Sequence, residues 1–199
     1  MTLKIGITGG IGSGKSSVCK IFKVLGAPVF EADVVAKKLM ESNLEIRSGL
    51  TDLFGTGIYS PNGRLDRKKL AGFIFNDDIQ LLKVNELVHP AVRANFLSWV
   101  EEQNAPYAIH EAAILFESGF YKMMDYTILV SAPELERVNR VSRRDKVSEK
   151  QVRERMQKQW PDAEKRKLAS FELKNADTDM ILPVVLKIDK QLRENGKIW

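Results

Sequence analysis

The stretch Gly9-Gly10-Ile11-Gly12-Ser13-Gly14-Lys15-Ser16 decides the fold of this 199-residue chain. It matches G-x-x-x-x-G-K-[ST] at every defined position. An apolar run at residues 3–8 precedes it, and a run with apolar residues at helical spacing, residues 17–25, follows it. A strand, a glycine-rich loop and a helix in this order predict a phosphate-binding loop (P-loop), because N–H groups at a helix N-terminus attract anions. The alternative is a glycine-rich turn with a chance lysine.

We expect this loop to hold a nucleoside triphosphate. The backbone N–H groups would cradle the phosphates, Lys15 would reach the β- and γ-phosphates, and Ser16 would offer its hydroxyl to Mg²⁺. The residues of this stretch predicted to bind the nucleotide are Gly10, Ile11, Gly12, Ser13, Gly14, Lys15, Ser16 and Ser17. The loop alone predicts nucleotide binding and does not define the reaction.

Composition narrows the class of protein. A chain of 199 residues, 44% hydrophobic and 29% charged, predicts one domain, or one core with inserted lobes. No apolar run approaches the roughly 18 residues of a membrane span, so we expect no membrane partner. The P-loop starts too early to leave room for a signal peptide, and the single cysteine, Cys19, rules out an internal disulfide. We therefore expect a cytoplasmic protein.

Short strand and helix patterns alternate around the P-loop. Further strands are expected at residues 29–30, 107–110, 126–131 and 169–173, and a closing helix at residues 183–192. Residues 34–103 are mainly helical, which is too long for a plain crossover and predicts an inserted lobe for the acceptor substrate. Two helices of this lobe are expected to begin at Asp66 and at His89-Pro90, after turns at residues 54–57 and 60–63.

The predicted fold class is therefore α/β. We expect a P-loop NTPase of three α/β/α layers with a parallel sheet, an inserted helical acceptor-binding lobe and a helical lid. The core would comprise about residues 1–32, 105–133 and 168–199, the lobe about residues 33–104 and the lid about residues 134–167.

Two acidic residues follow predicted strands. Asp33 comes just after the second strand, and Glu111 ends the strand at 107–110. Ligands of open α/β sheets bind at the carboxyl ends of the strands. Asp33 is thus a candidate for handling an acceptor, and Glu111 a possible metal ligand. Asp33 could also simply cap the next helix, and the two roles are compatible.

The segment from residue 134 to residue 170 is strongly basic. It holds twelve Lys/Arg against seven Asp/Glu, which accounts for the whole net charge of +5. Arg140 and Arg144, four apart, share one helix face, and Ser148 is expected to cap the next helix. We expect a polyphosphate partner and no nucleic acid. Nucleic-acid bases stack on aromatic side chains, and the only aromatic residues among these basic residues are Trp160 and Phe171. Two such helices are typical of a lid that is mobile without ligand; the alternative is a solvated hairpin.

Taken together, these motifs resemble the dephospho-CoA kinase family over nearly the full length. Residues 8–16 match the family's T-G-G-I-G-S-G-K-S, and Glu31-Ala32-Asp33 matches its D-A-D except at the first position. His89-Pro90 matches H-P, and residues 62–70 match D-G-x-x-D-R-x-x-L except at Asn62. The lid pattern R-x-x-x-R-D…R-x-x-x-Q is matched by Arg140, Arg144-Asp145, Arg155 and Gln159.

Two other family segments match less closely. Residues 111–117 read E-A-A-I-L-F-E where the family has D-x-P-L-L-F-E, so the aspartate and the proline differ. Residues 169–175 correspond to A-D-x-x-I-x-N. They keep the asparagine as Asn175 and have Ser170 in place of the aspartate.

The resemblance implies the last step of coenzyme A synthesis, in which ATP phosphorylates the 3′-hydroxyl of dephospho-CoA and gives CoA and ADP, with Mg²⁺ as cofactor. It implies that Asp33 orients or deprotonates that hydroxyl and that Lys15 and Arg140 stabilise the transferring phosphoryl group. The predicted site is completed by Arg144 and Asn175 for ATP, by Thr8, Arg67 and His89 for the acceptor, and by Ser16 with Glu111 for the metal.

Two alternatives remain open at this stage. Another small P-loop kinase, acting on a nucleoside or nucleotide, would share the core and the lid. A non-catalytic nucleotide- or RNA-binding protein would use the basic helices without transferring a phosphoryl group. A GTPase is disfavoured because the sequence holds no N-K-x-D for guanine and no D-x-x-G after a strand. The sequence leaves the oligomeric state open.

Overall fold

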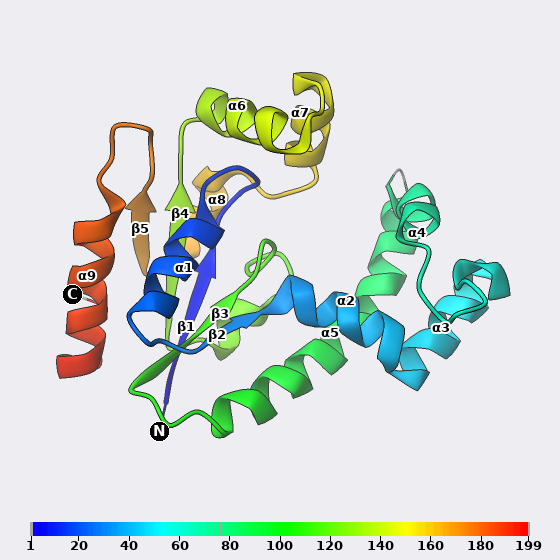
Figure 1. Cartoon of the computed structure of the whole chain (residues 1–199), viewed down its shortest axis with the longest axis horizontal. Helices are drawn as coiled ribbons and strands as arrows, with labels where there is room; N and C mark the ends of the chain where they lie inside the picture. The colour runs from blue at the N-terminus through cyan, green and yellow to red at the C-terminus, as the bar shows by residue number, and fades with distance from the viewer. Residues whose placement is uncertain (1, 76, 199) are drawn as a thin grey trace. The chain divides into compact units, whose positions relative to one another are not determined.

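The computed structural model describes residues 2–75 and 77–198 (Figure 1). Two compact units divide the chain: the first runs up to Glu31 and resumes at Trp99, and the second is Ala32–Ser98. Among the helices of the described residues, none is both long enough and apolar enough to cross a membrane.

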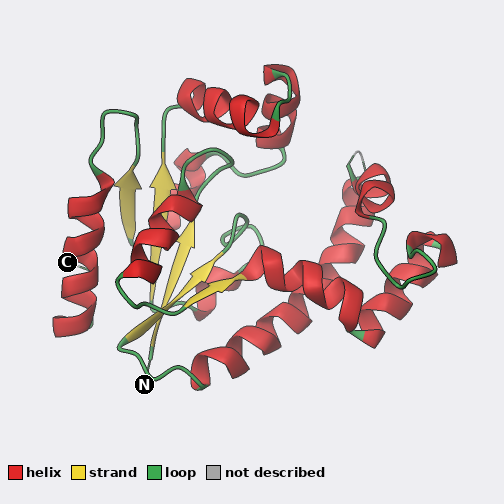
Figure 2. Ribbon diagram, in the orientation of Figure 1, coloured by secondary structure: helices red, strands yellow, loops and turns green. Residues whose placement is uncertain are grey.

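A five-stranded parallel sheet, yellow in Figure 2, forms the centre of the first unit. Its order is β2-β3-β1-β4-β5, and its strands are β1 Leu3–Thr8, β2 Val29–Glu31, β3 Tyr107–Glu111, β4 Tyr126–Ser131 and β5 Phe171–Lys174. The register pairs Glu111 with both Ile7 and Glu31. Because all strands run in the same direction, their carboxyl ends meet at one edge. The predicted parallel α/β fold is confirmed.

One face of the sheet is covered by α1 (Lys15–Val24) and α9 (Ile181–Asn195), which pack against each other. Alternate strand residues such as Ile5 and Ile7 point into this layer, as the period-2 geometry of a strand requires. They join Phe22 of α1 and Val185 of α9 in one core cluster that excludes water. This layer fixes the start of α1, and therefore the P-loop, above the end of β1.

The opposite face is covered by the segment after β3. A Cβ on Gly6 would lie 2.7 Å from Leu115, so the glycine permits this close approach. His110 of β3 is fully buried on this side, between the rings of Phe30 and Phe120. The three-layer arrangement around the sheet follows from these two packed faces.

The segment predicted to be a two-helix lid contains three helices. They are α6 (Glu134–Asp145), α7 (Glu149–Gln157) and α8 (Asp162–Leu168), and α8 packs against β4. Ser148 caps α7 in a capping box with Gln151, as its position in the sequence predicts. A small apolar cluster of Val138, Val141 and Val152 joins α6 to α7.

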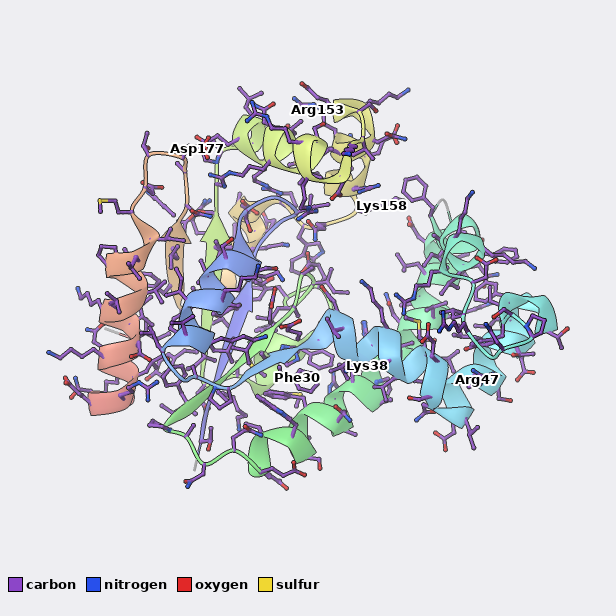
Figure 3. The ribbon with its side chains drawn as sticks, in the orientation of Figure 1. Phe30, Lys38, Arg47, Arg153, Lys158 and Asp177 are labelled. Atoms are coloured by element: carbon purple, nitrogen blue, oxygen red, sulfur yellow. The ribbon has the colours of Figure 1, made fainter. Side chains whose placement is uncertain are left out.

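The second unit is helical. Its helices are α2 (Ala32–Ser42), α3 (Leu44–Phe54), α4 (Arg67–Ile74) and most of α5 (Asp78–Glu101). Asp66 caps α4, which confirms the predicted helix start. The predicted turn at residues 60–63 is closed by an isolated bridge between Tyr59 and Leu65, and Arg47, labelled in Figure 3, donates to the carbonyl of Gly63.

The prediction that a new helix begins at His89-Pro90 is wrong. Helix α5 runs without interruption from Asp78 to Glu101, with Pro90 inside it. A proline in a helix interior removes one hydrogen bond and costs about 3 kcal/mol. Buried apolar residues nevertheless recur every fourth position on both sides of it: Val84, Val88, Val92, Phe96 and Val100. Burial of this continuous stripe outweighs the local penalty.

Candidate active site

The P-loop forms an anion-binding turn at the N-terminus of α1. Gly12 and Gly14 have φ angles of 81° and 88°, a left-handed conformation that glycine adopts without strain. Within the described chain, no hydrogen bond engages the N–H groups of Gly12, Gly14, Lys15 or Ser16. These donors stand at the positive end of the α1 dipole, where an anionic group is stabilised.

The side chains of Lys15 and Ser16 meet at one carboxylate oxygen. Oε1 of Glu111 accepts from Nζ of Lys15 at 2.6 Å and from Oγ of Ser16 at 2.8 Å. Lys15 and Glu111 are 96 residues apart in the chain, and the parallel register of β1 with β3 brings them together. The sequence predicted this carboxylate as a possible metal ligand, and the structure places it directly beside the predicted metal hydroxyl.

Glu111 carries a negative charge at neutral pH. Burial acts to raise its pKa, but the charge of Lys15 and the hydrogen bonds from Lys15 and Ser16 outweigh burial, so the net pKa is lowered. The described residues contain no group of three or more His, Cys, Asp or Glu side chains suited to a metal. Two hard oxygen donors with one negative charge nevertheless fit Mg²⁺, which takes one or two protein ligands and completes its shell with phosphate and water.

Asn175, just after β5, lies against the P-loop from the other side. Its Nδ2 donates to the carbonyl of Ser13 at 2.7 Å, and its own N–H donates to Ser131 at 2.8 Å. A Cβ on Gly14 would lie 2.0 Å from this amide, so the glycine allows the contact. Asn175 therefore joins the P-loop to the end of β4.

Arg140 of α6 contacts the loop that follows β5. Its Nη2 donates to the carbonyl of Asn175 at 2.9 Å and to Glu136 at 3.1 Å, and its Nε donates to Asp177, labelled in Figure 3, at 3.1 Å. Its Nη1 is buried and has no hydrogen-bond partner among the described residues. The guanidinium thus has one nitrogen without a partner beside Asn175.

The other predicted residues of the first unit differ in their exposure and contacts. Arg144 is largely exposed, and its hydrogen bonds go to the carboxylate of Asp145. Thr8 is buried and donates to the carbonyl of Ala113 at 3.3 Å. Ser17 lies exposed in the first turn of α1. These contacts do not bring Arg144 to the P-loop.

Three residues predicted to contact the acceptor substrate belong to the second unit, and their surroundings within that unit are as follows. Asp33 lies in the first turn of α2, two residues after β2 ends. Arg67 pairs with Glu41 at 3.1 Å. The pKa of His89 in α5 is lowered, first by burial and then by the nearby charge of Arg93.

Two residues that anchor the lid segment to the P-loop were not among the predicted site residues, although one of them, Gln159, belongs to the lid pattern matched in the sequence. Arg137 of α6 donates through Nε to the carbonyl of Ile11 at 3.0 Å, and Gln159 accepts from the N–H of Ile11 at 2.8 Å. The spacing of Arg137, three residues before Arg140, placed it on the same helix face. A run of charged residues, however, is typical of a solvent-exposed helix, so nothing in the sequence distinguished Arg137 from its charged neighbours.

A buried ion pair was missed as well. Lys165 of α8 is fully buried and lies 2.9 Å from Oε1 of Glu117, which also accepts from the N–H of Trp160 at 3.1 Å. Beside it, residues of α6, α7 and the connection to α8 line a cleft of about 680 Å³, among them Arg137, Arg153, Gln159 and Trp160. Through its ion pair with Glu117, Lys165 holds α8 against the segment that begins with Glu111.

The sheet order, the P-loop and the lysine–serine–carboxylate contact define a P-loop kinase. A sequence profile described as dephospho-CoA kinase matches residues 3–180. The chain belongs to the dephospho-CoA kinase family. The predicted resemblance and the predicted class of enzyme are thereby confirmed.

Individual relatives agree with this placement. A dephospho-CoA kinase of Bacteroides fragilis is 39% identical over 189 residues, covering 94% of this chain and 92% of the relative. One of Porphyromonas gingivalis is 40% identical over 192 residues, covering 96% and 95%. A solved protein of Thermus thermophilus superimposes with a TM-score of 0.79 at 37% identity, covering 89% of this chain and 90% of the other.

Proposed function

We propose that this protein transfers the γ-phosphoryl group of ATP to the 3′-hydroxyl of the dephospho-CoA ribose, giving CoA and ADP in the last step of CoA biosynthesis. Family membership supports the substrates and the reaction. The observation that carries the site assignment is the contact of Lys15 and Ser16 with Glu111 at the N-terminus of α1. Phosphoryl transfer needs mainly positioning and charge neutralisation, which these groups supply.

The P-loop is the donor side of the proposed site. Its unengaged N–H groups would hold the phosphates, and Lys15 would turn from Glu111 toward the β- and γ-phosphates. Ser16 and Glu111 would hold Mg²⁺, which supplies positive charge to the phosphate oxygens when bound. Asn175 and the free donor of Arg140 would contact the nucleotide, while Arg144 would approach it only when the lid closes.

Asp33 would handle the acceptor. It follows the carboxyl end of β2, on the edge of the sheet where the P-loop also lies, by only two residues. Its carboxylate would accept a hydrogen bond from the 3′-hydroxyl and take its proton as the new O–P bond forms and ADP leaves. Thr8, Arg67 and His89 are the remaining proposed acceptor contacts. A cytoplasmic location stays a prediction.

A substrate panel tests the proposal. ADP formation is measured with ATP, Mg²⁺ and either dephospho-CoA, a set of nucleosides or a set of nucleoside monophosphates. We expect turnover with dephospho-CoA that exceeds turnover with the other acceptors by several orders of magnitude. Activity on nucleosides or nucleotides alone would overturn the assignment. ATP binding with no turnover on any acceptor would favour a non-catalytic nucleotide-binding protein.

The role of Asp33 is tested by Asp33→Asn. The amide keeps the size of the side chain but loses the base, so we expect kcat to fall about 10²- to 10⁴-fold while the Kd for ATP stays within twofold. Asp52→Asn in α3 is the matched control, because it removes an acidic group from another helix of the same unit. Unchanged turnover would remove Asp33 from the mechanism.

A further inference from the structure

The tip of the P-loop is held by the lid segment through one residue. Ile11 uses its carbonyl to accept from Nε of Arg137 at 3.0 Å and its N–H to donate to Oε1 of Gln159 at 2.8 Å. Its side chain packs against the apolar cluster that joins α6 to α7. Both peptide groups and the side chain of Ile11 are thus committed to the lid segment.

Arg137 is itself locked in place. Only 8% of the residue is exposed, and its Nη1 lies 3.0 Å from Oδ2 of Asp162 at the start of α8. A Cβ on Gly10 would lie 2.1 Å from Nη2 of Arg137, and one on Gly12 would lie 2.6 Å from its carbonyl oxygen. The two glycines therefore admit the arginine, in addition to any role they have toward phosphate.

From these contacts we propose that Arg137 and Gln159 are positioning residues for ATP, which act by fixing the P-loop tip through Ile11. A glycine-rich loop loses much conformational freedom when it is ordered, and a loop that is ordered in advance loses less on binding phosphate. The remaining N–H groups of the loop then point to the phosphates without rearrangement. Ile11 is an anchor of the loop, and the donors that receive phosphate are the N–H groups of Gly12, Gly14, Lys15 and Ser16.

The experiment measures ATP affinity without an acceptor, by calorimetry, for Gln159→Met and Arg137→Met. The proposal rests on the proposed function only in taking ATP as the phosphoryl donor, and ATP affinity does not depend on the identity of the acceptor substrate. Gln159→Met removes the acceptor for the Ile11 N–H and leaves the Arg137–Asp162 pair intact, so the fold should survive. We expect about tenfold weaker ATP binding, an unchanged KM for dephospho-CoA, and kcat within threefold at saturating ATP.

Gln157→Met is the matched control. It changes the same residue type at the end of α7, where no hydrogen bond to the P-loop exists among the described residues. We expect its ATP affinity to equal that of the wild type. Arg137→Lys, which keeps the charge near Asp162 but cannot make both contacts, should fall between the wild type and Arg137→Met.

Three outcomes would overturn the proposal: unchanged ATP affinity in Gln159→Met, an equal rise in KM for both substrates, or the same loss in Gln157→Met. If Arg137→Met unfolds, Gln159→Met alone decides the question. ATP binding by the wild type without turnover on dephospho-CoA would contradict the proposed function alone. A wild type that does not bind ATP would contradict both.

Discussion

One carboxylate oxygen of Glu111 accepts hydrogen bonds from two residues of the P-loop. Its Oε1 accepts from both Lys15 and Ser16, so in this structure the lysine and the serine that should face ATP are tied to the sheet edge. The carboxylate balances the charge of Lys15 in a partly buried site, where an unpaired ammonium would be costly. We expect a bound triphosphate to replace this partner with phosphate oxygens and to free the carboxylate for a metal ion.

This exchange gives a prediction for Glu111→Gln. The amide keeps the shape and one acceptor oxygen but loses the charge that favours Mg²⁺. We expect kcat to fall about 10- to 100-fold and the Mg²⁺ concentration for half-maximal activity to rise. Both are measured from initial rates over a series of Mg²⁺ concentrations. ATP affinity in the absence of metal should stay equal or increase, because the phosphates no longer compete with a charged carboxylate for Lys15.

Glu172→Gln provides the control for this series. Glu172 also accepts a hydrogen bond from a serine, Ser131, and pairs with Arg166, but it lies on β5 outside the P-loop. Its Mg²⁺ dependence should match that of the wild type. If the Mg²⁺ dependence of Glu111→Gln also matches, Glu111 does not hold the metal.

At the scale of elements, α8 is attached to the segment after β3 by an ion pair and not by apolar side chains alone. Lys165 is fully buried and its partner Glu117 is 13% exposed at the side chain. Removing one member of such a pair leaves the other buried and uncompensated. The attachment therefore stabilises the fold only as long as both charges are present.

Lys165→Met should thus lower the free energy of unfolding by about 3 to 5 kcal/mol, measured by urea denaturation. The double variant Lys165→Met with Glu117→Gln should regain much of this loss, because the amide carries no charge and still accepts from the N–H of Trp160. Equal stability of the single and double variants would show that packing, and not the uncompensated charge, causes the loss.

The elements also show what the sequence could predict. The strands, the caps at Asp66 and Ser148, and the P-loop depend on local patterns, and each lies within two residues of its expected place; the largest shift is in β5, expected at residues 169–173 and found at Phe171–Lys174. The break expected at Pro90 was wrong because a local rule was overridden by burial along the whole helix. The buried state of Lys165 could not be predicted, because it depends on a carboxylate that lies 48 residues away on another segment.

The candidate site likewise contains residues that the sequence could predict and residues that it could not. The P-loop residues were predicted from spacing, because the chemistry of phosphate binding is contained in eight consecutive positions. The contacts of Arg137 and Gln159 with Ile11 span 126 and 148 residues, and no periodicity encodes them. The roles of Asp33 and Arg140 stay predictions that the proposed experiments address.

At the scale of the whole molecule, the two histidines make stability depend on pH. His110 in the first unit has a pKa lowered to about 4, mainly by burial, and burial also lowers the pKa of His89 in the second unit. Between pH 6.5 and pH 4 the unfolded chain binds a proton at His110 that the folded chain does not bind. Stability therefore rises with pH in this window and falls as the pH drops through it.

We expect His110 alone to remove about 2 kcal/mol of unfolding free energy between pH 7.5 and pH 5. The measurement is urea denaturation at both pH values for the wild type and for His110→Phe, which fills the space between two aromatic rings without titrating. The variant should lose most of the pH dependence and keep a smaller part from His89. A variant with the full wild-type dependence would show that His110 does not titrate in this range.

The close approach of Arg137 to Gly10 also has an evolutionary meaning. Positions 10 and 137 lie far apart in the sequence, yet the space that one leaves empty is the space that the other fills. A side chain at position 10 would collide with the guanidinium of Arg137, so we expect relatives that carry one there to have a shorter residue at position 137. The P-loop of this protein is therefore shaped to fit its lid segment as well as phosphate.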